Sequence, residues 1–388
     1  MKQQISQELT RNILPFWQKM VDTKNGGFYG QMTGENVLMP NAEKGGILNA
    51  RILWSFSSAY LELKNSEYLK TAKIAKIYIL KNFFDNEFGG TFWSLNADGS
   101  PADTKKQIYS QAFFIYALVE YYRATGDKIC LDKAIELFYL IEKHSFDTAQ
   151  NGYLEAYSRD WQLLEDLRLS DKDANEKKTM NTHLHILEAY TNLYRVWKNE
   201  HLAAQLKNLI EIFTDKIINP KTHHLDLFFD ENWTCKSTVI SYGHDIECSW
   251  LLLEAAEVLG DKLLINSVKQ ISVQMATAAA EGLLPEGGLI TEKNYDTGQV
   301  DNYRDWWSQA EAVVGFTNAY QLTKDEQFAQ KAGDVWAFIS DKIIDRENGE
   351  WHWGVDANGN IDTANDKAGF WKCPYHNSRM CLEMIRRM

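Results

Sequence analysis

Apolar residues recur along most of this chain at the spacing of amphipathic helices. In the segment 66–83 they include Tyr68, Ala72, Ala75 and Ile79, whose i, i+4, i+7 and i+11 positions share one helical face. The same periodicity predicts further helices at about 3–20, 44–63, 104–124, 128–144, 177–197, 201–217, 241–258, 262–279, 305–321, 326–343 and 375–387. Together with the segment 66–83, these make twelve predicted helices.

Polar breaks of two kinds alternate between these helices. Long breaks rich in glycine and aromatic residues lie at 25–28, 88–93, 151–153, 224–225, 286–288 and 348–351. Short breaks lie at 65–66, 126–127, 199–200, 260–261 and 324–325, about half a repeat away. One long loop and one tight turn in each repeat are typical of a helical hairpin, so the chain holds about six hairpins.

The two ends of the chain favour a closed arrangement of these hairpins. The first helix and the last helix each lack a hairpin partner, and a ring would pair them with one another. The segment 241–258 is hydrophobic on more than one face, which indicates that the helices after the long loops form an inner ring. We therefore predict an all-α (α/α)6 barrel. The alternative is an open α-solenoid, but that needs polar capping helices, and neither terminus has that character.

The repeat also sets the expected domain organisation. It continues without a Pro/Ser-rich linker, so residues 1–388 are predicted to form one catalytic barrel domain. Short β-hairpins are expected within the aromatic loops, for example at Gly27–Gln31 and Thr91–Ser94.

Composition narrows the range of partners. The net charge is −12 with both signs mixed along the chain, whereas nucleic acids and anionic membranes require clustered Lys and Arg. The five cysteines are scattered and lack CxxC spacing, which indicates a reducing compartment. Residues 3–20 carry charges among their apolar positions and resemble neither a signal peptide nor a membrane span. We expect a cytoplasmic monomer that binds neither nucleic acid nor membrane.

Candidate chemical residues fall near the starts of the helices that follow the long loops. They are Arg51, Tyr109, Phe113, Asn181, His185, His244, Glu247, Trp306, Trp307, Trp371 and His376. If those helices run parallel in an inner ring, all these side chains project into one funnel at one rim. Helix amino termini at that rim also favour anionic groups. This convergence predicts an active site, and aromatic rings at a polar funnel suit stacking on sugar rings.

A single histidine in a helix more often has a structural role. Five histidines are assigned to that class, namely His144, His201, His223, His224 and His352. Of the neighbours His183 and His185, which face different directions on a helix, one is expected to be a support. Equivalent placement in the repeats sets His185, His244 and His376 apart. His244 and Glu247 are spaced i, i+3, so the pair is able to interact.

Seven segments carry a resemblance to a known family. They are Arg51–Trp54, Pro101–Thr104, Tyr109–Phe113, Lys178–His185, Ser241–Glu247, Trp306–Ala312 and Trp371–Asn377. In these segments the chain resembles the N-acylglucosamine 2-epimerase family, and within it the cellobiose 2-epimerases. Because the segments span nearly the whole chain in order, the likeness does not depend on a single motif.

The resemblance implies a fold, a reaction and roles for particular residues. It implies an (α/α)6 barrel and metal-free epimerisation at C2 of a reducing-end glucose, with a disaccharide such as cellobiose as the substrate. By motif, His244 and His376 correspond to the two acid/base residues, and His185 to an assisting one. Arg51 corresponds to the residue that binds the oxygens near C1 and C2. The implied substrate contacts are Tyr109, Asn181, Glu247, Trp306, Trp307 and Trp371.

The same chemistry fits these residues without the resemblance. Inverting C2 requires opening the sugar ring, removing the C2 proton and returning it to the opposite face. Histidine, with a pKa near 6.5, can act as base or acid at neutral pH. A fixed guanidinium such as that of Arg51 can hold the oxygens of the intermediate enediolate.

Other functions stay open at this stage. An aldose–ketose isomerase, or an N-acylglucosamine or mannose 2-epimerase, would use the same site. An inverting glycoside hydrolase needs two carboxylates about 6.5–9.5 Å apart, for which Asp245 and Glu311 accompany Glu247. A helical-repeat binding protein would leave the rim histidines unexplained. Three histidines and a glutamate could ligate zinc, but HExxH, phosphate-loop and dinucleotide motifs are lacking, so we expect no metal and no cofactor.

Overall fold

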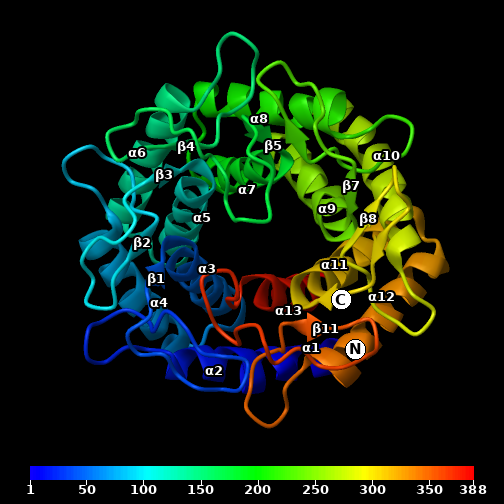
Figure 1. Cartoon of the computed structure of the whole chain (residues 1–388), viewed down its shortest axis with the longest axis horizontal. Helices are drawn as coiled ribbons and strands as arrows, with labels where there is room; N and C mark the ends of the chain where they lie inside the picture. Colours follow the sequence, from blue (N-terminus) through cyan, green and yellow to red (C-terminus); the bar gives the residue numbers. More distant parts are fainter.

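The computed structural model describes all 388 residues, and its helices form two concentric rings (Figure 1). The inner ring contains α3 (Gly46–Leu63), α5 (Ile108–Thr125), α7 (Met180–Val196), α9 (Tyr242–Leu259), α11 (Trp306–Thr323) and α13 (Tyr375–Arg387). The outer ring contains α4 (Ser66–Tyr78), α6 (Lys128–His144), α8 (Glu200–Ile212), α10 (Lys262–Ala279), α12 (Glu326–Phe338) and one continuous element made of α1 (Lys2–Glu8), a π turn (Leu9–Ile13) and α2 (Leu14–Lys19). The predicted twelve helices and the inner ring are confirmed.

The ring is closed by the two ends of the chain. Each inner helix packs against the next, and α13 packs against both α3 and α1. The indole nitrogen of Trp17 donates to Glu350 Oε2 at 2.6 Å, and that of Trp351 donates to Glu8 Oε1 at 2.9 Å. The first element is therefore tied to the last repeat by buried hydrogen bonds, and the open solenoid is wrong.

The short polar breaks contain residues that cap the helices on either side of each tight turn. Asn65, Asp127, Asn199, Asp261 and Asp325 are helix N-caps, and each side chain accepts a hydrogen bond from the first turn of the helix it begins. Before two of these caps, Gly126 and Gly260 end the preceding helix with φ of 74° and 87°, where a side chain would be strained. These caps set the boundaries of both helices in each hairpin.

The inner helices are buried on nearly all sides, as expected for a ring enclosed by a second ring. In α9, buried residues continue from Tyr242 to Ala256 with only two interruptions, at His244 and Glu254. The outer helices bury one face against them, which forms a single hydrophobic cluster between the rings. No helix combines the length and the apolar composition that a membrane span requires.

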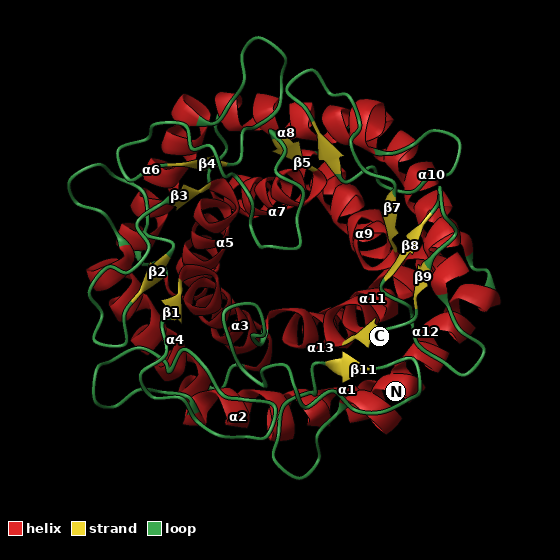
Figure 2. Cartoon of the chain, viewed as in Figure 1, coloured by secondary structure: helices red, strands yellow, loops and turns green.

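Short strands join successive loops on the face where the inner helices begin (Figure 2). The antiparallel pairs are β1 (Lys44–Gly45) with β2 (Ser94–Leu95), β3 (Lys106–Gln107) with β4 (Ala156–Tyr157), β5 (Lys178–Thr179) with β6 (Phe228–Phe229), and β10 (Arg304–Asp305) with β11 (Gly354–Val355). A three-stranded sheet contains β7 (Val239–Ser241), β8 (Glu292–Asn294) and β9 (Val300–Asp301). Only β8 and β9 form a local hairpin.

The two segments that were expected to be hairpins pair differently. Phe28 and Thr91 form single bridges with Val21 and Phe84, and Ser94 pairs with Gly45 of the preceding loop. The strands lie across repeats because residues directly before an inner helix need backbone partners, and the next loop supplies them.

Four of the long loops are each fixed by a buried lysine–aspartate ion pair. The lysine side chains before α3, α5 and α7 donate to aspartates that follow outer helices, and the pairs are Lys44–Asp22 at 2.8 Å, Lys106–Asp85 at 2.9 Å and Lys178–Asp147 at 2.8 Å. Lys367 and Asp345 form a similar pair in the last loop. Each aspartate also accepts backbone N–H groups two and three residues ahead. The loops that shape the mouth of the barrel are thus held at their bases.

These ion pairs predict acid sensitivity. Burial opposes ionisation of the aspartates, but hydrogen bonds from the cations and the loop amides outweigh it. They lower the pKa of Asp22, Asp85 and Asp147, and that of Asp345 to about 2. A depressed pKa stabilises the fold above the unfolded value of about 3.9, and this contribution is lost as the pH falls through the folded value. We expect the urea midpoint to fall steeply below about pH 4.

The variant Asp85→Asn removes one of these carboxylates, which Arg159 also contacts at 2.9 Å. It leaves the buried Lys106 charge without its anion, which costs about 3–5 kcal/mol of unfolding free energy at neutral pH. It should also weaken the dependence of the urea midpoint on pH in the acid range. A wild-type midpoint for Asp85→Asn at pH 7 would show that the pair does not hold the loop.

Candidate active site

The inner helices begin on the face with the loops and strands (Figure 2), and the predicted residues lie in or next to the first two turns of these helices. A cavity of about 360 Å³ opens there beside β5, β7 and the loop residues 167–176. Asn181 in the first turn of α7, Ser241 at the end of β7 and His244 in the first turn of α9 line it. The loop between β4 and β5 therefore covers part of the mouth.

The three predicted histidines share one geometry. His185 Nδ1 lies 3.0 Å from Glu188 Oε2, and His376 Nδ1 lies 2.8 Å from Glu311 Oε1. His244 Nδ1 lies 2.8 Å from the hydroxyl of Ser241. In each case Nδ1 is engaged from behind, and no protein group hydrogen-bonds Nε2. Nε2 is therefore the atom that each ring offers to a ligand.

Trp307 brings the two main histidines to one place. The ring centroid of His244 lies 4.7 Å from the indole, and that of His376 lies 5.4 Å from the same indole. Trp306 packs against His376 at 5.4 Å. Helices α9 and α13, far apart in the sequence, thus present their imidazoles around one tryptophan, as the sequence predicts.

Both of these imidazoles are neutral at neutral pH. Burial, with a smaller contribution from the neighbouring His185, lowers the pKa of His244 to about 3. Burial, followed by the positive charges of Arg51 and Arg379, lowers the pKa of His376 well below its usual value. An uncharged imidazole with a free nitrogen can accept a proton.

Arg51 is a buried cation that makes no ion pair. Its side chain is 3% exposed, and Nη2 donates to the Tyr109 hydroxyl at 2.8 Å. The guanidinium carbon lies 4.2 Å from the ring centre of Phe113 and 4.7 Å from that of Tyr375. Nε has no hydrogen-bond partner. A buried charge without a counterion is costly, so this guanidinium is suited to an anionic ligand.

Aromatic rings extend the site from Arg51 toward solvent. His185 lies 4.9 Å from the ring of Tyr109 and 4.7 Å from that of Phe113. Trp371, which is half-buried, lies 6.0 Å from Tyr109. The structure thus brings both predicted contacts from α5 next to the third histidine.

Two predicted contacts have unsatisfied polar atoms. Trp306 Nε1 and Asn181 Oδ1 are buried without a protein partner. Most buried polar groups are hydrogen-bonded, so an unpaired donor and an unpaired acceptor at this end of the barrel point to a hydroxylated ligand.

The expected pair between His244 and Glu247 is not formed. His244 turns back to Ser241, whereas Glu247 Oε1 accepts a hydrogen bond from Arg379 on α13 and lies 3.8 Å from His376 Nδ1. Burial and the neighbouring Glu311 raise the pKa of Glu247 to about 7. The prediction failed because a side-chain partner on another helix outcompetes a neighbour one turn away.

The remaining carboxylates argue against a hydrolase. Asp245 accepts hydrogen bonds from the backbone of Leu225 at 2.8 Å and lies 2.6 Å from His224 Nδ1, behind the site. Glu311 accepts from Trp250 at 3.1 Å and from Arg379 at 2.6 Å. Neither carboxylate is free to flank a glycosidic bond, so the pair that an inverting mechanism needs is missing.

One cluster has the spacing of a metal site. Ligand atoms of Glu247, Glu311 and His376 lie within 4.8 Å of one another. The guanidinium of Arg379 donates to both carboxylates, so a side chain supplies the positive charge between them.

Sequence reasoning missed Arg379, Glu188 and Tyr375. Spacing offered a signal, because Glu188 follows His185 by three residues and Arg379 follows His376 by three. His183 was expected to be a possible support, and it is one: Nδ1 lies 2.7 Å from Thr179 O, and Nε2 accepts from the backbone of Tyr153 at 3.0 Å.

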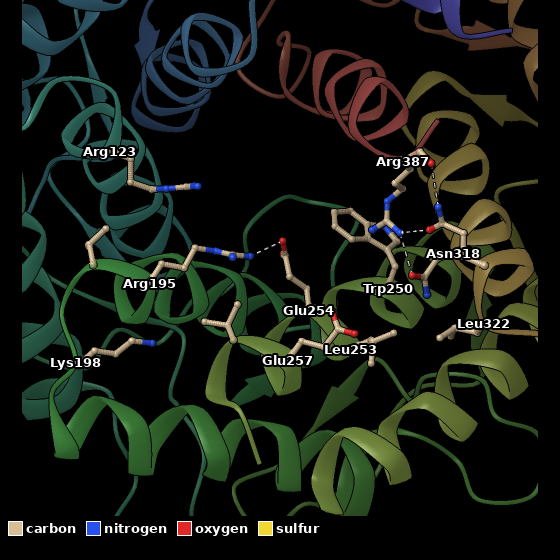
Figure 3. A pocket seen from close by; sticks show the side chains of 13 residues that line it. Arg123, Arg195, Lys198, Trp250, Leu253, Glu254, Glu257, Asn318, Leu322 and Arg387 are labelled. Atoms are coloured by element: carbon tan, nitrogen blue, oxygen red, sulfur yellow. Dashed lines mark hydrogen bonds and ion pairs between the residues drawn. The ribbon is translucent and has the colours of Figure 1, made fainter. Parts of the chain in front are cut away.

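The opposite end of the barrel contains a different cavity, of about 860 Å³ (Figure 3). Two of its arginines already have partners: Arg195 is 2.6 Å from Glu254, and Arg387 donates to Asn318 at 3.0 Å. No histidine lines this cavity. The candidate active site is therefore at the loop-bearing end.

Comparison with known proteins identifies the family of this chain. Residues 27–379 match N-acylglucosamine 2-epimerase (GlcNAc 2-epimerase). The chain belongs to the N-acylglucosamine 2-epimerase family. A family relative, the cellobiose 2-epimerase of Bacteroides fragilis, is 55% identical over 386 residues, which is 99% of this chain and 98% of that protein. The cellobiose 2-epimerase of Ruminococcus albus is 44% identical over 385 residues, again covering 99% and 98%.

A solved structure from the N-acylglucosamine 2-epimerase family shares the fold. The cellobiose 2-epimerase of Bacillus thermoamylovorans superposes with a TM-score of 0.96 at 42% identity, covering 100% of this chain and 99% of that chain. The predicted (α/α)6 barrel is confirmed. Family membership makes the protein a sugar 2-epimerase, an enzyme of the isomerase class, as the sequence predicts.

Proposed function

We propose that the protein inverts C2 of the reducing-end glucose in a β-1,4-linked disaccharide. The substrate would be cellobiose, converted to 4-O-β-glucosylmannose, and lactose would give epilactose. The support is full-length similarity to two proteins named cellobiose 2-epimerase. We further propose that residues 1–388 act as one catalytic domain, as a cytoplasmic monomer that needs no metal or cofactor and has no nucleic-acid or membrane partner.

The observation that carries this proposal is the pair of imidazoles around Trp307. In the opened sugar, Nε2 of one histidine removes the C2 proton, and its electron pair forms a C1–C2 double bond while O1 becomes anionic. Nε2 of the other histidine, in the neutral tautomer that carries its proton on this nitrogen, then gives that proton to the opposite face of C2, while the C1–C2 double bond supplies the electron pair and O1 returns to a carbonyl. The Ser241 hydroxyl can either donate to or accept from His244 Nδ1, so His244 can serve as acid or as base.

Proton transfer by the histidines does not supply the whole rate enhancement, so other residues must stabilise the enediolate. Positioned acid–base catalysis contributes roughly 10²–10⁴-fold, and one oxyanion donor roughly 10²–10³-fold. In the proposed mechanism, Arg51 and Tyr109 hold the enediolate oxygens, with His185 assisting. The proposed sugar contacts are Tyr109, Phe113, Asn181, Glu247, Trp306, Trp307 and Trp371.

Trp371→Ala tests the proposed stacking. Because this indole is half-buried, its removal should raise KM for cellobiose about 2–10-fold, the equivalent of roughly 0.5–1.5 kcal/mol, with little change in thermal midpoint. Steady-state kinetics and calorimetry measure both. An unchanged KM together with a lowered midpoint would instead make Trp371 a core residue.

Carbon-13 NMR of reactions with cellobiose, lactose, N-acetylglucosamine and mannose tests the function as a whole. Glucosylmannose from cellobiose in the presence of EDTA supports the proposal. A ketose product would indicate an isomerase, N-acetylmannosamine an N-acylglucosamine 2-epimerase, and free glucose a hydrolase. No turnover of any sugar would favour a binding protein.

A further inference from the structure

One buried arginine lies behind the proposed site and contacts three inner helices. Arg379 is 1% exposed and follows His376 by one turn on α13. It donates to Glu188 on α7, to Glu247 on α9 and to Glu311 on α11, the last at 2.6 Å. Its Nη1 also contacts the Tyr375 hydroxyl.

Two of these carboxylates connect Arg379 to histidines. Glu188 uses Oε1 for Arg379 and Oε2 for His185 Nδ1, at 3.0 Å. Glu311 uses Oε1 for both Arg379 and His376 Nδ1, at 2.8 Å from the ring. A single guanidinium therefore contacts two carboxylates, each of which also hydrogen-bonds an imidazole, and the two imidazoles lie on different helices.

We propose that Arg379 is a positioning residue that keeps the Glu188 and Glu311 carboxylates ionised, and so holds His185 and His376 with the proton on Nδ1 and a free lone pair on Nε2. The role deepens the proposed function, on which it rests for the identity of the reaction. The positions of the imidazole protons can be measured in the enzyme without substrate, so they do not depend on which reaction it catalyses.

The charge balance explains why the carboxylates need this arginine. The groups that face it are Glu188 and His185 on α7, Glu247 on α9, Glu311 on α11, Tyr375 and His376 on α13, and Tyr116 on α5. Burial opposes ionisation of Glu188, but the charge of Arg379 and the bond to His185 lower its pKa to about 2. Burial raises the pKa of Glu311, and Arg379 opposes that rise.

Losing Arg379 would reverse the hydrogen bonds to the histidines. An ionised carboxylate can only accept, so Nδ1 must carry the proton. A protonated carboxyl donates instead, which turns Nδ1 into an acceptor and moves the imidazole proton to Nε2. The nitrogen that faces the sugar could then no longer remove a proton.

Arg379→Lys tests the role, because the single ammonium of lysine cannot bridge Glu188, Glu247 and Glu311 as a planar fork does, so the carboxylates lose part of the cation contact that keeps them ionised. We expect kcat for cellobiose to fall roughly 10²–10⁴-fold with KM within about threefold, and the acid limb of the kcat profile to move to higher pH. The matched control is Arg195→Lys, which alters another arginine–carboxylate pair between α7 and α9 at the far end of the barrel and should retain wild-type kcat (Figure 3).

Nitrogen-15 NMR shows which imidazole nitrogen carries the proton, and it tests the proposal on the wild-type enzyme even if Arg379→Lys does not fold. In the wild-type enzyme, His185 and His376, assigned with His185→Gln and His376→Gln, should carry the proton on Nδ1. In Arg379→Lys the proton should shift toward Nε2. A proton on Nε2 of either histidine in the wild type overturns the proposal, as does wild-type kcat in the variant, or lost kcat with unchanged tautomers. Failure of the wild type to convert cellobiose would instead refute the proposed function and leave the tautomer result standing.

Discussion

Replacing His244 with alanine should abolish the conversion of cellobiose to glucosylmannose, and replacing His376 should do the same. Each imidazole presents an Nε2 without a protein partner beside Trp307, and proton transfer to or from C2 needs both. We expect kcat to fall roughly 10²–10⁴-fold in each variant. Product formation by carbon-13 NMR measures the loss.

The control for these variants is His201→Ala. His201 is an exposed histidine on the outer helix α8, 3.3 Å from Glu142, and its removal should leave kcat unchanged. A conservative change adds a sharper readout. In His376→Gln, the remaining His244 should still exchange the C2 proton of one epimer with solvent, although no epimer is formed. Near wild-type turnover by either alanine variant would remove that histidine from the mechanism.

Arg51→Met should separate activity from stability. The guanidinium is buried without a counterion, so its removal takes away an unpaired charge and should leave the thermal midpoint unchanged or higher. The same change removes the cation proposed to hold the enediolate. We expect kcat to fall roughly 10²–10³-fold, which corresponds to about 3–4 kcal/mol of transition-state stabilisation.

Calorimetry and steady-state kinetics on the same preparation measure both effects. A loss of kcat below tenfold would assign the anion to another group, and a midpoint several degrees lower would make Arg51 a structural residue.

Local signals made most of the fold predictable. The Asn and Asp residues that begin the outer helices act as N-caps in the structure, and the apolar periodicity between them gave the helices. The starts of the inner helices were predicted too early, except that of α13. The predicted helix at 104–124 begins at Ile108, because Lys106 and Gln107 pair with Tyr157 and Ala156 of the next loop. A pairing about 50 residues away leaves no local pattern.

The candidate site was predictable only in part. Repetition put His185, His244 and His376 at equivalent positions, and the structure places two of them at one indole. The buried charged residues behind these histidines were not predicted, because in the sequence Arg379 and Glu188 look like ordinary charged residues on a helix surface. Their partnership joins residues 191 positions apart, and only the closed ring brings them together.

In the proposed mechanism, one histidine takes the C2 proton and another returns a different one. Epimerisation of cellobiose in deuterated water, followed by proton and carbon-13 NMR from the first turnover, tests this most directly. Every newly formed glucosylmannose should carry deuterium at C2. A product that keeps the hydrogen its substrate carried at C2 would contradict this mechanism.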